Sequence, residues 1–168
     1  MLPAKLKRQN LFLNGSNYAG EAKSVKLPNI KYKTEGYRAG KMSGEAKWRS
    51  GIDDSKLEFT LGGLSAPTIR AIGTTQLDGA QLRFAGAYQR DDTGQISAVE
   101  VLVQGQINET DFGDAETGKD TEHKFTVDWV YYKLTIDGVD EVEIDLLNGI
   151  EKFGGVDVAA GLRAAAGG

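Results

Sequence analysis

The sequence predicts a single, mainly β domain with one or two helices, and three observations support this. Apolar and polar residues alternate with a period of two over long stretches, as in strands that bury one face. Gly supplies 22 of the 168 residues and Pro only 3, which indicates many turns. A clear helix start signal occurs once. The length suits one domain, and no linker or fixed-period repeat divides residues 1–168.

The first predicted hairpin spans about 81–108. Leu82, Phe84 and Tyr88 alternate with polar or small residues, and a second alternating run follows from 99 to 107. The stretch Asp91-Asp92-Thr93-Gly94 between them is rich in turn formers. The two strands should therefore share one apolar face and one mostly polar face.

The second predicted hairpin spans about 121–145 and turns at Asp137-Gly138. Register follows the apolar face, so we expect Leu134 to pair with Val142. This register predicts a three-residue loop, 137–139, with the glycine in a left-handed conformation.

The apolar face of the strand that opens this hairpin changes sides along its length. Phe125 and Val127 lie on one face, whereas Tyr132 and Leu134 lie on the other, and the change occurs near Trp129. This pattern predicts either a bulge or a strand that packs on different neighbours at its two ends.

One helix is predicted at about 66–76. Ser65 can act as its N-cap, Pro67 suits its first turn and Leu64 can contact Ile69. The Ala-rich stretch 156–166 has weaker helical character, with Asp157 as a candidate cap. The remaining expected elements are two loops, 36–54 and 110–120, and shorter strands at 10–14, 18–27, 30–35, 45–49 and 57–62.

Charge is divided unevenly along the chain. The net charge is −4, but residues 1–56 hold 12 Lys and Arg against 5 Asp and Glu, which gives +7. Residues 57–168 hold 8 against 19, which gives −11. Folding can neutralise this split within one chain. Head-to-tail contact between copies can also use it, and such heterologous contacts build rings or open filaments.

The sequence gives little support to catalysis. The chain has no Cys, which excludes disulfides, thiolate nucleophiles and cysteine metal sites. It has one His, His123, which lies in a charged segment and is expected at an exposed position of a strand. The triplet Asp111-Phe112-Gly113 occurs without the other kinase motifs. The run 111–122 has the length of an EF-hand loop but lacks its ligand positions. We therefore expect no catalytic, cofactor or metal site and no membrane-spanning helix.

Between positions 31 and 49 the chain combines six Lys and Arg with three aromatic residues, Tyr32, Tyr37 and Trp48. A nucleic-acid platform has this composition. An adhesive loop that docks on an acidic protein surface has it too, with Tyr, Trp and Arg as anchors. The excess of acid elsewhere in the chain favours the second interpretation.

Several short segments, in this order and over nearly the whole chain, resemble the major tail tube proteins of contractile phage tails and of the headless R-type pyocins. They are Leu11-Phe12-Leu13-Asn14-Gly15, Tyr18-Ala19-Gly20, Leu27-Pro28, Tyr37-Arg38-Ala39-Gly40, the run 83–94, Tyr131-Tyr132-Lys133-Leu134, Asp137-Gly138, Glu143-Ile144-Asp145 and Asn148-Gly149. The Ala-rich end, 164–168, departs from the more polar end of that family.

The resemblance implies a two-sheet β-sandwich or barrel with a flanking α-helix. Six copies would form a ring, their inner sheets would join into one multi-chain β-barrel, and stacked rings would make a hollow tube. The implied function is structural rather than enzymatic. The implied partners are other copies of the chain, the tail sheath, baseplate or tail-tip proteins and a tape-measure protein inside the tube. The implied location is the virion tail, assembled in the host bacterial cytoplasm.

Two sets of residues are candidates for assembly and conduction. We expect the 36–54 loop to reach the adjacent ring through Tyr37, Arg38, Met42, Trp48 and Arg49. A lumen that passes DNA should lack unpaired Lys and Arg, because these residues bind phosphate. The expected lumen-facing residues are Glu100, Gln104, Gln106, Thr126 and Asp128.

Three other interpretations remain open on sequence alone. The tube can pass ions rather than DNA, as in a bacteriocin-like particle. The subunit can belong to a non-contractile tail or to a secretion system. The chain can also be a monomeric β binding module that uses its basic, aromatic stretch.

Overall fold

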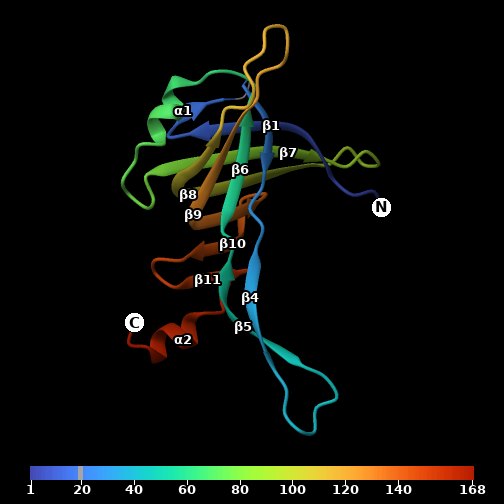
Figure 1. Cartoon of the computed structure of the whole chain (residues 1–168). Coiled ribbons are helices and arrows are strands. Elements are labelled where there is room, and N and C mark those ends of the chain that lie inside the picture. Colours follow the sequence, from blue (N-terminus) through green and yellow to red (C-terminus); the bar gives the residue numbers. More distant parts are fainter. Residues whose placement is uncertain (19–20) are drawn as a thin grey trace.

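In the computed structural model, a curled antiparallel sheet carries a projecting hairpin and two short helices (Figure 1). The structure describes residues 1–18 and 21–168; residues 19 and 20, which belong to the expected strand 18–27 and to the Tyr18-Ala19-Gly20 segment, lie outside this part. The helices are α1 (Ala66–Ala71) and α2 (Ala160–Ala165). The strands are β1 (Lys5–Leu13), β2 (Ser16–Asn17), β3 (Ala22–Lys26), β4 (Lys31–Tyr37), β5 (Ala46–Asp53), β6 (Lys56–Leu61), β7 (Ala80–Gln89), β8 (Ile96–Asp111), β9 (His123–Ile136), β10 (Val139–Asp145), β11 (Ile150–Phe153) and β12 (Val156–Asp157).

The period-two segments form the centre of the main sheet. β7 and β8 pair as the first predicted hairpin, and Leu82 and Phe84 face the core together with Val101 and Val103. The mainly β fold with a flanking helix is therefore confirmed. The strand order is β12-β11-β10-β9-β8-β7-β1-β2, with β3 and β6 branching from β9.

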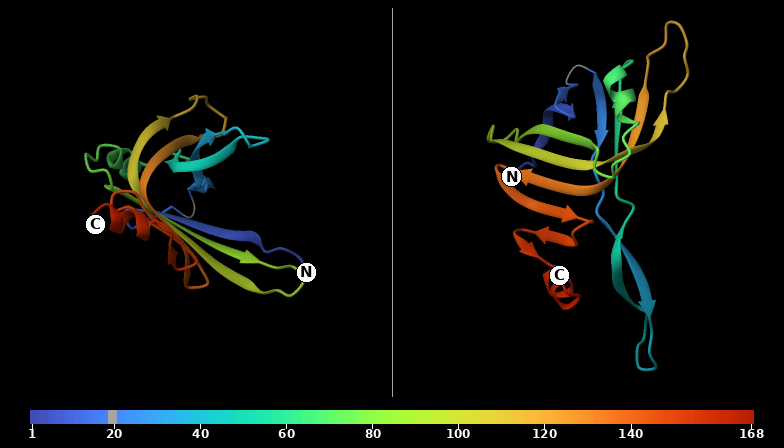
Figure 2. Two further views of the ribbon diagram at one scale, coloured as in Figure 1. Left: turned by 90° about the horizontal axis from the view of Figure 1, so that it is seen from below. Right: turned by 90° about the vertical axis from the view of Figure 1, so that its left-hand side faces the viewer.

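The branch at β9 divides this sheet into two layers. The first half of β9 pairs with β6, from His123 opposite Leu61 to Asp128 opposite Lys56. Its second half pairs with β10, beginning at Tyr131. β8 runs along the other edge of both halves. The two layers curl toward each other around one core, and Figure 2 shows the bend of β8 and β9 from below.

A β-bulge lies at the branch point, where the sequence predicted a change of face. Gln104 pairs with Tyr131 and Gly105 with Trp129, so Val130 has no partner on β8. The amide of Trp129 donates to the carbonyl of Ser55, at 3.1 Å, and the carbonyl of Val130 accepts from the amide of Leu146, at 2.9 Å. The extra residue shifts the alternation by one, which lets both halves of β9 face the same core.

The core consists of apolar side chains from β1, β6, β7, β8, β9 and β10, with Tyr18 from a loop. Its buried members are Leu11, Leu13, Tyr18, Leu57, Phe59, Leu61, Ala80, Leu82, Phe84, Val101, Val103, Ile107, Phe125, Val127, Trp129, Tyr132 and Ile144. Burial of this much apolar area is the main contribution to stability.

The register of the second hairpin is confirmed, but its predicted loop is wrong. Leu134 pairs with Val142 as expected. The loop has two residues rather than three, with φ of 50° at Asp137 and 81° at Gly138, as a tight primed turn requires. An unpaired Glu141 after the turn restores the expected register.

The first predicted helix begins as expected and ends five residues early. Ser65 caps α1, because its Oγ accepts from the amide of Thr68 at 3.5 Å. The helix covers the end of the core through Ala71 and Ile72. Leu64 stays 77% exposed, so a contact with Ile69 adds little burial.

The second helix is shorter than the predicted stretch 156–166, and its expected cap is wrong. Residue Ala159 occupies the cap position of α2 and makes no side-chain hydrogen bond there. Asp157 instead lies in β12, accepts from the amides of Glu151 and Ala159, and pairs with Arg163 at 2.8 Å. These contacts hold the Ala-rich end against β11.

The segment expected as a loop at 36–54 is mostly a hairpin, since β4 and β5 pair from 31 to 53. Only residues 38–45 form its tip. The hairpin projects from one end of the molecule, and the β8–β9 loop projects from the opposite end (Figures 1 and 2). In the described part of the chain, neither helix has the length and apolar character to span a bilayer.

Candidate functional site

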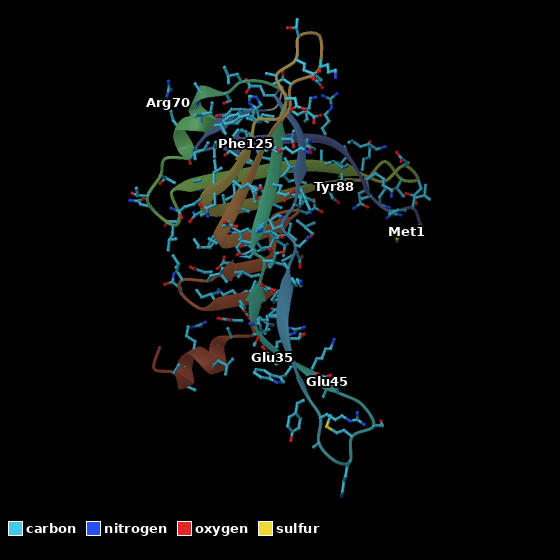
Figure 3. The ribbon with its side chains drawn as sticks, viewed as in Figure 1. Met1, Glu35, Glu45, Arg70, Tyr88 and Phe125 are labelled. Atoms are coloured by element: carbon cyan, nitrogen blue, oxygen red, sulfur yellow. The ribbon has the colours of Figure 1, made fainter. Side chains whose placement is uncertain are left out.

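The projecting β4–β5 hairpin carries all five residues expected to contact an adjacent ring. Tyr37 is 61% exposed and Trp48 is 54% exposed, which is unusual for large aromatic side chains. Figure 3 shows the side chains of this hairpin standing clear of the body of the protein, with Glu35 nearer the body and Glu45 nearer the tip. A carbon added at Gly36 would meet only the side chain of Glu45, which is exposed and can move aside.

The two faces of the hairpin differ in chemistry. Cross-strand register places Glu35 opposite Trp48 and Tyr37 opposite Ala46, so both exposed aromatic residues share one face. Lys47 and Arg49 alternate with them on β5 and therefore lie on the other face. The outer part of the hairpin thus presents an aromatic face and a basic face.

Two of the five expected contact residues are engaged within the hairpin itself. The Met42 sulfur accepts from the amide of Ala39 at 3.3 Å, and its own amide donates to the Ala39 carbonyl at 2.9 Å. The Arg49 guanidinium carbon lies 4.1 Å from the centre of the Tyr32 ring. Met42 and Arg49 therefore stabilise the hairpin.

Tyr32 also connects the base of the hairpin to the body. Burial raises the pKa of its phenol, the negative charge of Glu151 raises it further, and Arg49 opposes both. Ile52, opposite Tyr32 on β5, packs against the core. The base of the hairpin is thus fixed while its outer part is exposed.

Three of the expected lumen residues lie on β8, on the face that points away from the core. Glu100, Gln104 and Gln106 alternate with buried valine and isoleucine. Glu100 and Gln104 lie opposite β7 and the second half of β9. The side-chain Nε2 of Gln106 donates to the carbonyl of Thr74, at 3.4 Å, so the segment after α1 approaches this end of the face.

The other two expected lumen residues lie on β9 beyond the bulge, where Asp128 is directly opposite Gln106. Thr126 is opposite Glu58, and Asp128 is opposite Lys56, on the β6 side of the branch. Asp128 accepts from the side-chain amide of Asn108 at 2.7 Å. Because β8 and β9 bend there, these two residues lie on a different part of the curved outer face from Glu100 (Figure 2).

Sequence reasoning missed the basic side chains around Glu100. The guanidinium of Arg83 pairs with the Glu100 carboxylate at 3.1 Å, and its carbon lies 4.4 Å from the centre of the Phe12 ring. Lys133 pairs with Asp140 at 3.4 Å. The alternation of apolar and polar residues along β7 and β9 could have predicted them, because Arg83 and Lys133 both fall at positions that point away from the core. The outward face of β7, β8 and the second half of β9 is therefore largely neutral, and its cations are held by carboxylates.

Tyr131, on the same face, gives a test of this electrostatic environment. Burial and the negative charge of Glu143, to which its hydroxyl donates at 3.3 Å, raise the pKa of Tyr131 to about 12. The folded state then holds a proton that the unfolded state loses at the ordinary tyrosine pKa of 10.0. The free energy of unfolding should therefore fall as pH rises from 10 to 12.

Denaturant unfolding at several pH values, compared between the wild type and Tyr131→Phe, measures this effect. Part of the loss above pH 10 should disappear in the variant. An unchanged pH profile would mean that Tyr131 is not perturbed.

The histidine is not exposed, contrary to expectation. His123 is 8% exposed and lies edge-on to Phe112, with ring centres 5.0 Å apart. His123 is two residues before Phe125 and four before Val127 on β9, so its side chain points to the same buried face. No group of three or more His, Asp or Glu suited to a metal occurs in residues 1–18 and 21–168.

Comparison with known proteins identifies the family of the chain. The family described as phage tail tube protein FII matches residues 3–167. The chain belongs to this family. The tail tube protein of Escherichia phage P2 is 48% identical over 159 residues, which cover 93% of this chain and 92% of the relative. The major tail tube protein of Serratia phage KSP20 is 37% identical over 156 residues, which cover 92% and 90%.

Solved structures similar to this tail tube protein come from contractile injection systems. A chain from the sheath/tube terminator of an extracellular contractile injection system, PVC, aligns with a TM-score of 0.59 at 14% identity, covering 80% of this chain and 98% of that one. A chain of the anti-feeding prophage baseplate gives 0.57 at 11% identity, covering 83% and 99%. At these identities the likeness shows a shared fold.

Proposed function

We propose that the chain is the structural subunit of the inner tube of a contractile tail, without catalytic activity. Six copies form a ring, and rings stack head to tail into a hollow conduit. The match to the tail tube family over residues 3–167 carries this proposal. The two curated relatives, both named as tail tube proteins and covered over at least 90% of their length, support it.

The edges of the main sheet support closure into a ring. In the described part of the chain, β1 pairs with β2 only at Phe12 and Leu13, and the carbonyl of Leu11 accepts from the amide of Tyr18, so the outer edge of β1 from 5 to 10 has no strand partner. An exposed edge of this kind pairs readily with another strand. Joining the edges of neighbouring subunits removes them and produces one closed barrel.

The outward face of β7, β8 and the second half of β9 is the proposed lumen wall. DNA should pass it without specific binding, because Arg83 and Lys133 are held by carboxylates and attract phosphate weakly. In a bacteriocin-like particle the same lumen would pass ions.

The proposed partners are the sheath, baseplate or tail-tip proteins and a tape-measure protein. The proposed location is the virion tail, assembled in the host bacterial cytoplasm.

The β4–β5 hairpin is the proposed contact between rings. We expect that replacing residues 38–45 with Asn-Gly leaves a folded chain, because this tip makes no contribution to the core and Asn-Gly forms a two-residue turn. The variant should form single rings that do not elongate. Negative-stain electron microscopy at high concentration, with a baseplate added as a nucleus, measures this outcome against wild-type tubes.

Two results would contradict the proposal. Normal tubes from the shortened variant would show that residues 38–45 are not needed for the contact between rings. A wild-type chain that remains monomeric in the presence of a baseplate would contradict the tube itself and favour a monomeric binding module.

A further inference from the structure

The outer part of the hairpin, residues 36–49, has charge that the chain does not neutralise. Arg38, Lys41 and Lys47 are exposed, and none of them forms an ion pair with another described residue. Residues 36–49 contain four Lys and Arg against one Glu, a net charge of +3. Together with the exposed Tyr37 and Trp48, these side chains need a partner that is both acidic and partly apolar.

The β8–β9 loop at the opposite end of the molecule has the complementary chemistry. Residues 109–122 contain six Asp and Glu and one Lys, a net charge of −5. Phe112, at the start of the loop, is 48% exposed. Its ring makes edge contacts with His123 and Phe125, and the rest of the ring is open to solvent. The loop also borders an open hollow of about 280 Å³, lined mainly by carboxylates that include Asp111 and Asp114, together with Lys119 and Lys124.

The carboxylates of the β7–β8 turn are less available. Asp91 pairs with Lys7 at 3.0 Å and Asp92 with Arg90 at 2.9 Å, so the β7–β8 turn is neutralised within the chain. In the β8–β9 loop, Lys23 pairs with Asp120 and with Glu122, and Lys119 pairs with Glu116. The carboxylates of Glu109, Asp111 and Asp114 have no ion-pair partner among the described residues. Of these two acidic loops, the β8–β9 loop therefore has the greater unpaired charge.

We infer that the β8–β9 loop is the receptor for the hairpin tip of a second copy of the chain in the adjacent ring. This inference rests on the proposed function. The two surfaces lie at opposite ends of the molecule (Figures 1 and 2), so they cannot meet within one chain. A contact between unlike ends is heterologous and continues indefinitely along an axis, as a tube requires.

Each part of the contact has a distinct contribution. Arg38 and Lys41 pair with Asp111 and Asp114, which orients the rings and accelerates their encounter. Tyr37 and Trp48 bury apolar area beside Phe112, and aromatic anchors of this kind supply much of the affinity of an interface. Ion pairs at the rim are screened by salt, whereas aromatic burial is not, so high salt should slow stacking more than it dissolves finished tubes.

The absence of Cys from the natural sequence allows a direct test by site-specific cross-linking. Tubes of the double variant Lys41→Cys and Asp114→Cys are treated with a flexible bismaleimide and separated on a denaturing gel. Each chain has one tip and one loop, so contact between rings should give a ladder that continues beyond six chains. The matched control is Lys41→Cys with Thr93→Cys, which places the second thiol on the neutralised β7–β8 turn and should give no ladder.

The outcomes separate this inference from the proposed function. A ladder that stops at six chains would mean that tip and loop meet inside one ring. No ladder from intact tubes would place the receptor elsewhere. Either result overturns the inference and leaves the tube intact, whereas a wild-type chain that never forms rings or tubes would overturn both.

Charge reversal gives a second, independent measurement. Arg38→Glu with Lys41→Glu should stop elongation at single rings, and Asp111→Lys with Asp114→Lys should do the same. Combining all four substitutions in one chain should restore elongation, since the reversed tip then meets a reversed loop. Each variant is first checked for a wild-type circular dichroism spectrum. A combined variant as defective as its parents would contradict the pairing.

Discussion

Gly105→Ala should be among the most destabilising single substitutions in the chain. A methyl group there would lie 2.2 Å from the carbonyl oxygen of Asp128 and 2.7 Å from the Cα of Trp129, both of them backbone atoms. Backbone at a sheet branch cannot move aside as a flexible side chain can. Overpacking in a filled site typically costs about 1–3 kcal/mol, so we expect a loss of about 3 kcal/mol in the free energy of unfolding.

The effect should be specific to the bulge. Gly63→Ala is the matched control, because a methyl group at Gly63 meets no atom within 4 Å. Its expected change is about 0.5 kcal/mol or less. Urea unfolding followed by Trp fluorescence measures both variants. Equal denaturant midpoints for Gly105→Ala and the wild type would show that β8 and β9 separate there more easily than the structure indicates.

This bulge also shows how far the sequence predicts the fold. Phe125 and Tyr132 are both buried, although one has an odd and the other an even position on the same strand. That conflict predicts either a bulge near Trp129 or a strand with different neighbours at its two ends, and the structure has both. The identity of the strands that pair with each half of β9 could not be predicted. Pairing partners distant in sequence leave no local signal.

The hairpin at 31–53 was only partly predicted, for a related reason. Period-two alternation marks a strand only when one face is buried. Apart from Tyr32 and Ile52, the side chains of β4 and β5 are exposed, so both faces are polar or aromatic and the pattern is absent. The strands 30–35 and 45–49 were expected, but the length of β5 was not.

The sequence also predicted which side chains of β8 point away from the core, whereas their position in a lumen stays a prediction. Parity placed Glu100, Gln104 and Gln106 on the outward face of β8 correctly, since Val101 and Val103 alternate with them in the core. The alternation of residues along a strand does not show where the strand bends. The curl of β8 and β9 therefore separates Thr126 and Asp128 from Glu100, although all of them face away from the core.

Glu100→Lys should make the proposed lumen retain DNA. The substitution removes the partner of Arg83 and adds a second cation beside it, so two unpaired positive charges replace a neutral pair. In a six-membered ring this change occurs six times, and it is repeated at every ring. Each phosphate contact contributes about 0.9 to the slope of log affinity against log salt, so retention should be steep in salt.

The measurement is the release of linear duplex DNA from reconstituted tubes, or from particles, at several salt concentrations. Wild-type tubes should release DNA at all of them, whereas Glu100→Lys tubes should hold it at low salt and release it at high salt. Glu100→Gln is the matched control: it leaves Arg83 unpaired without adding a cation, so its retention should be intermediate.

Assembly should be unaffected, because Glu100 is partly exposed and lies outside the core. Release from Glu100→Lys tubes identical to the wild type would mean that this face does not line the conduit. A folded variant that fails to assemble would instead place Glu100 in a contact between subunits.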